Sequence, residues 1–281
     1  MANEKHLEIL KQGVEVWNEW RENNPEIEPD LSNEDLRNAD LSGANFSNTN
    51  LSDAYLRQAD LSNANFEEAD LSSADFLGAD ISGANFLGAD LSYACFKGAY
   101  LKGANLCRID LTTVDLSEAY AVRNEDSDEL YIIRVDLSEA NLSEVNLSEV
   151  NLSEVNLTHA LLSEANLTKV ILQDATLTEA NLEKANLEGA NLSGADLSRA
   201  NLRDAYLREA KLSSNSKHDT KLVGANLSET TLNSAKLVGV NLTGANLSKS
   251  YLIEANFNGA ELVGINLREA FISRADFSWL T

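Results

Sequence analysis

A large apolar residue recurs at every fifth position along most of this 281-residue chain. The series runs from Leu31 to Leu116, slips by one residue, and continues from Leu137 to Phe277. Ala usually stands two residues before each of these central positions, and Asn or Asp one residue before it. A period of five matches neither the 3.6-residue period of a helix nor the alternation of a strand. The repeat therefore predicts a solenoid built from short, stacked units.

Certain side chains also recur at every twentieth residue. The phenylalanines fall into three such series, Phe46, Phe66 and Phe86, then Phe76 and Phe96, then Phe257 and Phe277. Asparagines do the same at Asn45, Asn65, Asn85 and Asn105, and later at Asn146, Asn166, Asn186, Asn226, Asn246 and Asn266, with Tyr206 interrupting. Four repeats thus make one turn of the solenoid. Aromatic rings that recur on one wall can stack, and amides that recur there can bond in ladders.

The pattern A-(D/N)-(L/F)-x-x, as in Ala39-Asp40-Leu41 and Ala190-Asn191-Leu192, resembles the pentapeptide-repeat family. The resemblance implies an all-β solenoid, a right-handed quadrilateral parallel β-helix of about 12 coils of 20 residues stacked about 4.8 Å apart. In that fold the central residue and the residue two before it point inward, and the other three point outward. Thirteen of the 14 glycines lie two after a centre, at one recurrent turn.

The two ends of the chain differ in sequence. Residues 4–23 have helical spacing at Leu7, Leu10, Val14 and Trp17, and Pro25 follows. We expect residues 1–30 to form a capping helix and linker for a single β-helix over 31–281, the alternative being a helix that docks a partner. At the other end Trp279 and Leu280 are expected to cover the last coil in part, and the alternative is a homodimer through that end.

Two segments interrupt the repeat. Residues of about 120–131 are polar, and the 21 residues from Leu116 to Leu137 predict one distorted coil with a single extra residue and a loop. A second loop is expected at about 213–220, with the five-residue register continuing through it and Lys217 at a central position.

No catalytic or metal-binding pattern is present in the sequence. His6, His159 and His218 are far apart in the chain, and none has metal-ligand spacing. Cys95 and Cys107 are expected on opposite faces of the coils, where they cannot form a disulfide. We therefore expect no enzyme activity, no metal and no cofactor.

The formal net charge of −23 argues against direct nucleic-acid binding. Two outward columns of acidic residues are the candidate interaction surface: Asp40, Asp60 and Asp80 on one wall, and Asp70, Asp90 and Asp110 on the opposite wall. Either these carboxylates only accept local amide hydrogen bonds, as Asx turns do, or they imitate a nucleic-acid duplex toward a basic protein. Bound cations are a third reading. Glu139, Glu144, Glu149 and Glu154 share one turn position. This arrangement favours a role in solubility over imitation of a nucleic-acid duplex.

The charge and the repeat together favour a non-catalytic acidic scaffold or protein-interaction module. The expected partners are a basic protein surface or a regulatory protein. The family resemblance adds two narrower alternatives, a DNA-mimicking modulator of DNA gyrase and a regulatory partner of a transcription or differentiation factor. The N-terminus lacks a signal-peptide pattern and no apolar run has membrane-spanning length, so a cytoplasmic protein without membrane contact is expected.

Overall fold

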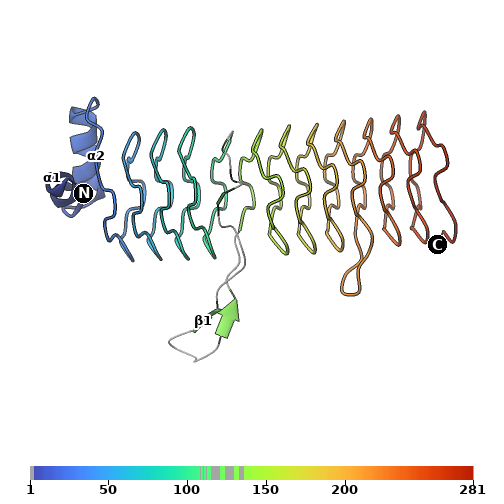
Figure 1. The fold of residues 1–281 in the computed structure, drawn as a ribbon, viewed down its shortest axis with the longest axis horizontal. Coiled ribbons are helices and arrows are strands. Elements are labelled where there is room, and N and C mark those ends of the chain that lie inside the picture. Colours follow the sequence, from blue (N-terminus) through green and yellow to red (C-terminus); the bar gives the residue numbers. More distant parts are fainter. Residues whose placement is uncertain are drawn as a thin grey trace. The chain divides into compact units, whose positions relative to one another are not determined.

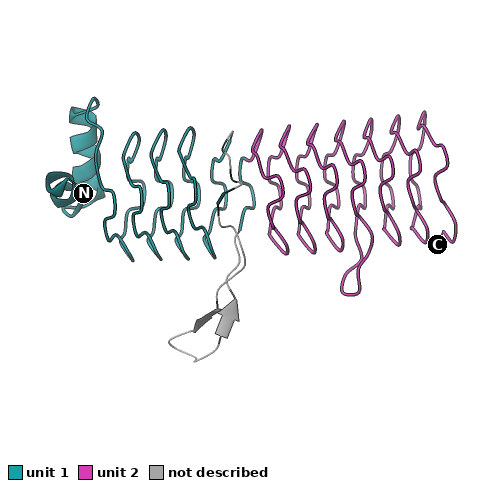
Figure 2. Cartoon of the chain, in the orientation of Figure 1, with its two compact units in different colours: residues 1–141 teal, residues 142–281 magenta. Residues whose placement is uncertain are grey.

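The computed structural model describes residues 3–107, 109, 111, 113–114, 121–123, 130–132 and 136–280. The chain divides into two compact units, residues 1–141 and residues 142–281 (Figure 2). Two helices, α1 (Glu4–Leu10) and α2 (Val14–Asn23), precede the first coil of unit 1 (Figure 1). In the described chain, β1 (Ala121–Arg123) and β2 (Leu130–Ile132) are the two continuous strands, and they pair antiparallel.

Each unit is a stack of coils (Figure 1), and the bridges between them define four walls. Isolated parallel β-bridges join residues twenty apart, such as Asp40 with Asp60 and Asn45 with Asn65, and they recur every five residues along the chain. The amide of central Leu41 donates forward to the carbonyl of Asp60 at 2.7 Å, and the amide of Asp60 donates back to Ala39 at 3.0 Å. Because each wall contributes so few paired residues, the coils hold bridges rather than long strands. The predicted 20-residue coil is confirmed.

The core consists of the central residues and the residues two before them, with the remaining positions facing outward. Leu61, Ala64 and Phe66 are fully buried in this way. The predicted phenylalanine stacks are present: ring centroids lie 5.5 Å apart for Phe46 and Phe66, 5.0 Å for Phe66 and Phe86, 4.7 Å for Phe76 and Phe96, and 4.9 Å for Phe257 and Phe277. Offset and near-parallel rings at these distances are favourable.

The recurrent turn position has a left-handed backbone whether or not it carries glycine. Glu144 has φ 57°, Glu149 64° and Glu154 60°, close to the 69° of Gly43. A non-glycine residue with this conformation costs about 1–2 kcal/mol, and it persists because the amide on the turn is bonded to the next coil, as for Glu144 and Ser163 at 2.9 Å. Glycine makes this position recognisable in the sequence, but most of the described turns have another residue there.

The N-terminal segment contains two helices rather than the single helix predicted over 4–23. Gly13, at φ 113°, separates α1 from α2, because a residue with that backbone conformation cannot continue a right-handed helix. Leu10 and Trp17 are buried, whereas Leu7 and Val14 are only half-buried. The ring of Trp17 lies 5.7 Å from the ring of Phe46, so α2 covers the first coil.

The prediction of one extra residue in the first break was wrong. Tyr100 bridges Asp136 and Asn105 bridges Asn141, so the coil there is 36 residues long, sixteen more than the regular coil. The β1–β2 hairpin lies within this insertion. A hairpin adds residues without advancing the coil, and a count of five-residue steps cannot detect it. Residues 115–120, 124–129 and 133–135 of this break, and Asp110, lie outside the described residues.

The second predicted loop is present, but its register was wrong. Asp196 bridges Lys221 and Lys211 bridges Lys236, twenty-five residues apart, so five extra residues enter this coil. Lys217 is exposed in the loop rather than central, and buried Thr220 takes the inward place of an alanine.

The insertion divides the predicted later asparagine column into two. Asn146, Asn166 and Asn186 continue into Tyr206, Thr231, Tyr251 and Phe271, whereas Asn226, Asn246 and Asn266 continue from Asn181 and Asn201. Both columns form amide ladders, as in the bond from Asn166 Nδ2 to Asn146 Oδ1 at 2.9 Å and from Asn266 Nδ2 to Asn246 Oδ1 at 2.9 Å.

Candidate interaction surfaces

One wall of unit 1, here called the acidic wall, carries Asp40, Asp60 and Asp80 in an unbroken bridged column. Serine follows each of them two residues later, at Ser42, Ser62 and Ser82. The Asp60 carboxylate accepts the Ser62 amide at 3.0 Å and the Ser62 hydroxyl at 2.7 Å, and both bonds end on Oδ1. Asp80 and Ser82 repeat this geometry at 3.0 and 2.6 Å.

The local bonds hold the carboxylates of the acidic wall in one orientation. Since Oδ1 of Asp60 and of Asp80 takes both serine donors, Oδ2 of each is left to face solvent on an exposed residue. Asp40 accepts the Ser42 amide at 3.4 Å, while the Ser42 hydroxyl contacts that of Ser62 at 3.0 Å. The Asx-turn reading of these aspartates is therefore confirmed, and it is compatible with a partner that binds the second oxygen.

A hollow lies where the acidic wall meets the connection between α1 and α2. It is lined by Gly13, Val14 and Val16 on the helical side and by Asp40 and Ser42 on the wall. Val16 is one of the exposed large apolar residues of the chain. An apolar contact and a row of carboxylates thus adjoin each other on one face of unit 1.

The second predicted acidic column lies two walls away from the acidic wall. Asp70 bridges Asp90, and each accepts the amide of the serine two residues later, Ser72 at 3.0 Å and Ser92 at 2.9 Å. Hydrogen bonds from the Ser92 hydroxyl and amide lower the pKa of Asp90, so its carboxylate is held ionised. Asp110, the third predicted member, lies outside the described residues.

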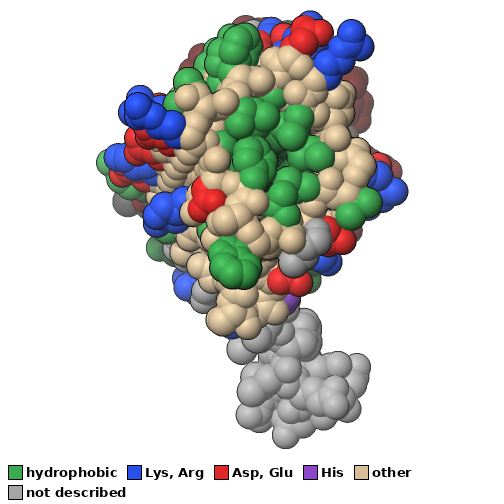
Figure 3. All heavy atoms as spheres, turned by 90° about the vertical axis from the view of Figure 1, so that its right-hand side faces the viewer, with side chains coloured by type: hydrophobic (Ala, Val, Ile, Leu, Met, Phe, Trp, Pro, Cys, Tyr) green, Lys and Arg blue, Asp and Glu red, His purple; other side chains and the backbone are tan. Residues whose placement is uncertain are grey.

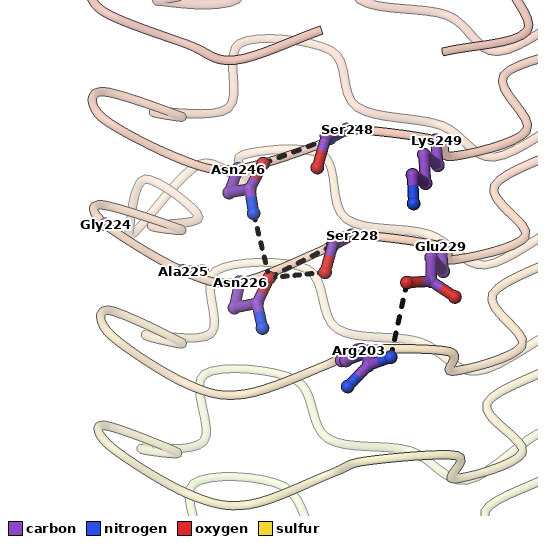
Figure 4. Close-up of a pocket in the computed structure, with 9 residues that line it drawn as sticks. All are labelled: Arg203, Gly224, Ala225, Asn226, Ser228, Glu229, Asn246, Ser248 and Lys249. Carbon is purple, nitrogen blue, oxygen red and sulfur yellow. Dashed lines mark hydrogen bonds and ion pairs between the residues drawn. The ribbon is translucent and has the colours of Figure 1, made fainter. Parts of the chain in front are cut away.

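The asparagine ladder of unit 2 borders a charged groove (Figure 4). Asn226 Oδ1 accepts the Ser228 hydroxyl at 2.8 Å and Nδ2 of Asn246 at 3.3 Å. At the adjacent corner an Arg203 guanidinium nitrogen lies 3.3 Å from a Glu229 carboxylate oxygen, and Lys249 points toward the same corner from the next coil (Figure 4). Arg203 and Lys249 contribute two positive charges to this groove and Glu229 one negative charge.

The loop of unit 2 folds back onto the coils through Asp174. The carboxylate Oδ1 accepts Asn215 Nδ2 at 2.7 Å and lies 3.0 Å from His218 Nδ1, and the Asp174 side chain is only 4% exposed. Burial alone would raise the pKa of Asp174, but hydrogen bonds from Asn215, His218 and Gln173 outweigh it and lower the pKa. This contact could not be predicted from the sequence, because it joins residues more than forty positions apart.

Glycine is required beneath the loop contact. A Cβ on Gly194 would meet both Asp174 Oδ1 and Asn215 Nδ2. The Gly194 amide donates to the Thr220 hydroxyl at 2.7 Å, which replaces the main-chain acceptor of a regular coil. The loop is therefore anchored to its wall by specific bonds. The hollow beside it is lined by charges of both signs, Lys217 and Lys221 together with Asp196 and Asp219.

Polar side chains of α2 complete the first coil of unit 1. Asn18 donates to the Gly43 carbonyl at 3.0 Å and accepts the Asn45 amide at 2.8 Å, as a neighbouring strand would do. Buried Arg21 donates to the carbonyls of Ile27 and Ser47, both at 2.7 Å. Sequence reasoning found the apolar face of α2 and missed these residues, which in the sequence resemble an ordinary solvent-exposed helix face.

In the last coil of unit 2, Trp279 and Leu280 were predicted to cover the apolar centre in part. Trp279 is 82% exposed and Leu280 46% exposed. Trp279 occupies a turn position with φ 55°, and side chains at such positions point outward. The expectation of partial self-capping was therefore wrong for Trp279, while Leu280 is about half-exposed.

Other predicted chemistry can be located in the described residues. Cys95 and Cys107 do not form a disulfide. His6 is buried, and its Nδ1 accepts the Asp30 amide at 3.0 Å. Within the described ranges, no three His, Cys, Asp or Glu side chains come together as metal ligands would. No helix in the same ranges combines the length and apolar character needed to cross a membrane.

The profile of the family described as pentapeptide repeats matches residues 28–122, 136–213 and 218–279. No curated protein sequence matches the chain. Among solved structures, HetL of Nostoc sp. strain PCC 7120, a pentapeptide repeat protein involved in heterocyst differentiation regulation, is 30% identical over 88% of this chain and 86% of its own, with a TM-score of 0.27.

Two further solved structures are similar to the chain. The pentapeptide repeat protein Rfr23 of Cyanothece 51142 is 23% identical over 65% of this chain and 86% of its own, with a TM-score of 0.15. QnrB1, a plasmid-mediated fluoroquinolone resistance protein, is 14% identical over 79% of this chain and 88% of its own, with a TM-score of 0.36.

Proposed function

The chain belongs to the pentapeptide-repeat family, and we propose that it is a non-catalytic interaction module whose acidic wall binds a basic protein surface. Members of the family fold as right-handed quadrilateral β-helices and generally serve as structural or interaction modules. The observation that carries the proposal is the bonding of Asp60 and Asp80, each of which turns one carboxylate oxygen to serine and the other to solvent.

The charge of unit 1 supports a basic partner. Residues 1–141 contain 10 Lys and Arg against 28 Asp and Glu, a net −18, whereas residues 142–281 contain 12 against 17, a net −5. A field of this size increases the rate at which a cationic partner associates. A rigid wall also spares the cost of ordering the acidic side chains on binding.

The hollow beside Asp40 supports a partner that combines a basic stretch with an apolar anchor. Val14 and Val16 offer apolar contact there, and the carboxylates of the acidic wall follow directly. Protein interfaces often join a buried apolar contact to a charged rim in this manner. We therefore expect the partner to present Lys or Arg side chains in a row that ends at an apolar residue.

The test is affinity capture with a matched pair of variants. The first replaces Asp40, Asp60 and Asp80 with Asn, which keeps the Oδ1 acceptor and occurs at this repeat position on a neighbouring wall. The second replaces Asp30, Asp70 and Asp90 with Asn, which removes the same three charges from the opposite wall. Circular dichroism melting verifies that both variants remain folded.

We expect the first variant to lose a partner that the native chain and the second variant retain, with a fall in affinity of at least tenfold. Equal losses from both variants would mean that net charge alone governs binding, and retention by both would reject the acidic wall. Purified DNA gyrase is one defined basic partner to include. If supercoiling is unchanged by micromolar native chain, the gyrase alternative is excluded.

A further inference from the structure

One outward wall of unit 2, here called the lysine wall, carries two lysines and no acidic residue over four adjacent coils. Its bridged outward column runs from Asn191 through Lys211 and Lys236 to Asn256. Both lysines are exposed. The remaining outward residues of these coils on this wall are uncharged: Ser193, Gly194, Ser213, Ser214, Val238, Gly239, Asn258 and Gly259. In a chain of net −23 such a wall is an exception.

The lysine wall lacks the ion pairs that are common elsewhere in unit 2. There a cation usually meets a carboxylate of a neighbouring coil, as Lys184 meets Glu164 at 3.2 Å. Figure 3 shows Lys and Arg side chains beside Asp and Glu side chains at the margin of the molecule. Four cations within residues 142–280 form no ion pair: Lys211 and Lys236 on the lysine wall, Lys217 in the adjoining loop, and Lys249.

The two lysines of the wall also oppose each other. Bridged residues of adjacent coils are about 5 Å apart, and like charges directly opposite each other on neighbouring strands are destabilising. The coil does not require lysine at this position, because Asn191 and Asn256 occupy it on the coils to either side. A repulsive pair that the fold does not need is suited to an anionic ligand.

The carboxylates that border the lysine wall are already engaged with other side chains: Glu209 with Arg208 at 3.2 Å, Glu254 with Arg274 at 3.3 Å, and Asp174 with His218 at 3.0 Å. The Asp174 carboxylate also accepts a bond from Asn215 and is nearly buried. Lys211 and Lys236 are therefore left without a counter-charge among the described residues of unit 2.

The five-residue insertion adds two cations beside the lysine wall. Its loop is held there by Ser214, whose hydroxyl donates to the Gly239 carbonyl at 2.6 Å. Lys217 and Lys221 line one hollow beside the loop, and Lys221 lies 3.7 Å from Asp196. Counted together, the lysine wall and this hollow carry four lysines against Asp174, Asp196 and Asp219, a net +1. Unit 2 as a whole is net −5, so positive charge is concentrated here.

We propose that the lysine wall binds a short acidic segment of a partner protein, in which Asp or Glu side chains flank an apolar residue. Lys211 and Lys236 supply ammonium donors for the carboxylates. Val238 lies on the same wall, and at 39% exposed it offers an apolar contact beside them. The small residues Ser214 and Gly239 leave the wall low, so that an extended segment can lie against it.

The size and setting of the lysine wall favour a short segment over nucleic acid. Its paired lysines occupy two adjacent coils, and charges are screened beyond about 8 Å at physiological salt. A nucleic-acid strand gains affinity by contacting many cations at once. Such a strand would extend past the two lysines to the carboxylates that border these coils, on a chain of net −23.

The test is fluorescence anisotropy of the full chain with a labelled peptide in which glutamates flank a central leucine. A peptide with glutamine in place of each glutamate and a labelled oligothymidylate are the comparison probes. The key variant combines Lys211→Gln with Lys236→Gln. Its matched control combines Lys169→Gln with Lys184→Gln, which removes two positive charges from ion pairs of the same unit.

A second variant, Val238→Glu, places a negative charge on the lysine wall without removing a lysine. Circular dichroism melting verifies that all variants remain folded. The variant of the acidic wall with Asn in place of Asp40, Asp60 and Asp80 should bind the glutamate peptide at least as well as the native chain. The outcome for the lysine wall is therefore separate from that for the acidic wall.

We expect the native chain and the control variant to bind the glutamate peptide alike. The key variant should bind it about tenfold more weakly, and Val238→Glu should weaken it as well. Failure of the native chain to bind this peptide would overturn the proposal, and so would equal losses in the key and control variants. Tighter, lysine-dependent binding of the oligothymidylate would assign the wall to nucleic acid instead. Self-association that the key variant abolishes, measured by light scattering, would assign it to a second copy and reject the acidic segment.

Discussion

Units 1 and 2 have the same coil geometry and different chemistry on their surfaces and in their cores. Unit 1 stacks phenylalanine in its core and carries a net −18, with aspartates bonded mainly to nearby serines. Unit 2 has a leucine-rich core and a net −5, and ion pairs such as Lys169–Glu149 and Lys184–Glu164 connect adjacent coils. The bridges between coils are parallel and regular in both.

The difference shows that the repeat separates folding from surface chemistry. Two positions of each five determine the core, and the main chain connects the coils regardless of what the outward side chains are. The outward positions can therefore form an acidic wall in one unit and a nearly neutral, ion-paired surface in the other. This separation suits a family that serves in interaction, because a binding surface can change while the scaffold is kept.

The largest effect is expected from the phenylalanine core of unit 1. Phe66 stacks between Phe46 and Phe86 and meets Phe76 edge-on, with ring centroids 6.2 Å apart. Phe66→Ala should lower the free energy of unfolding by about 3–5 kcal/mol, since it opens a cavity in a closed stack. Urea denaturation followed by circular dichroism measures this.

Phe66→Leu is the informative comparison, because unit 2 fills the same kind of position with leucine. We expect a loss of no more than about 1.5 kcal/mol, as for other swaps that nearly conserve apolar volume. If Phe66→Leu lowered the free energy of unfolding as much as Phe66→Ala, leucine could not replace phenylalanine in the core of unit 1. The two units would then share interchangeable chemistry only on their surfaces.

The next effect concerns the cap that α2 forms on the first coil of unit 1. Asn18→Ala removes both the donor to Gly43 and the acceptor for the Asn45 amide. Leaving these backbone groups without partners should cost about 1–3 kcal/mol. Glu19→Ala, on the exposed side of the same helix, is the control and should be neutral. If Asn18→Ala left the free energy of unfolding unchanged, water would satisfy the Gly43 carbonyl and the Asn45 amide equally well.

The predictions from the sequence were correct where a residue type has a single geometric role in the coil. Phe46, Phe66 and Phe86 predicted both the wall and the coil length, because twenty residues is the spacing that stacks their rings. It failed at the two insertions, since the hairpin and the loop change the number of residues per coil without altering the repeat on either side. Asp174 shows the same limit, because its loop partners could be found only once the coils were in register.

The loop contact of unit 2 should make one glycine less replaceable than its equivalents. Gly194 and Gly103 share a left-handed backbone, with φ 77° and 68°, but nothing lies within 4 Å of a Cβ built on Gly103. Gly103→Ala should cost about 1–2 kcal/mol for the backbone conformation alone. Gly194→Ala should cost more and also free the loop, because its Cβ would displace the Asp174–Asn215 pair.

Denaturation measures the stability of both glycine variants, and limited proteolysis at residues 213–219 measures release of the loop. Faster cleavage is expected for Gly194→Ala alone. If the two variants were equally stable and were cleaved at the same rate, the loop contact would not explain a stronger requirement for glycine in unit 2.

Acid should weaken the same contact. The pKa of Asp174 is lowered in the folded chain, so its contribution is present above the unfolded pKa, about 3.9, and is lost as pH falls through the lower folded pKa. Below pH 4 the native chain should therefore lose stability more steeply than Asp174→Asn, which cannot titrate there. Denaturation midpoints at several pH values test this, and parallel pH profiles would contradict it.

The smallest effect is expected from the ion pairs that characterise the surface of unit 2. Lys169 and Glu149 approach to 3.0 Å, but about two-thirds of each side chain is exposed, so solvent screens their attraction. Lys169→Gln should change the free energy of unfolding by less than about 1 kcal/mol, and added salt should reduce even that difference. A larger, salt-independent loss would mean that these pairs help to hold the coils together, and the surface of unit 2 would then be part of its fold rather than separable from it.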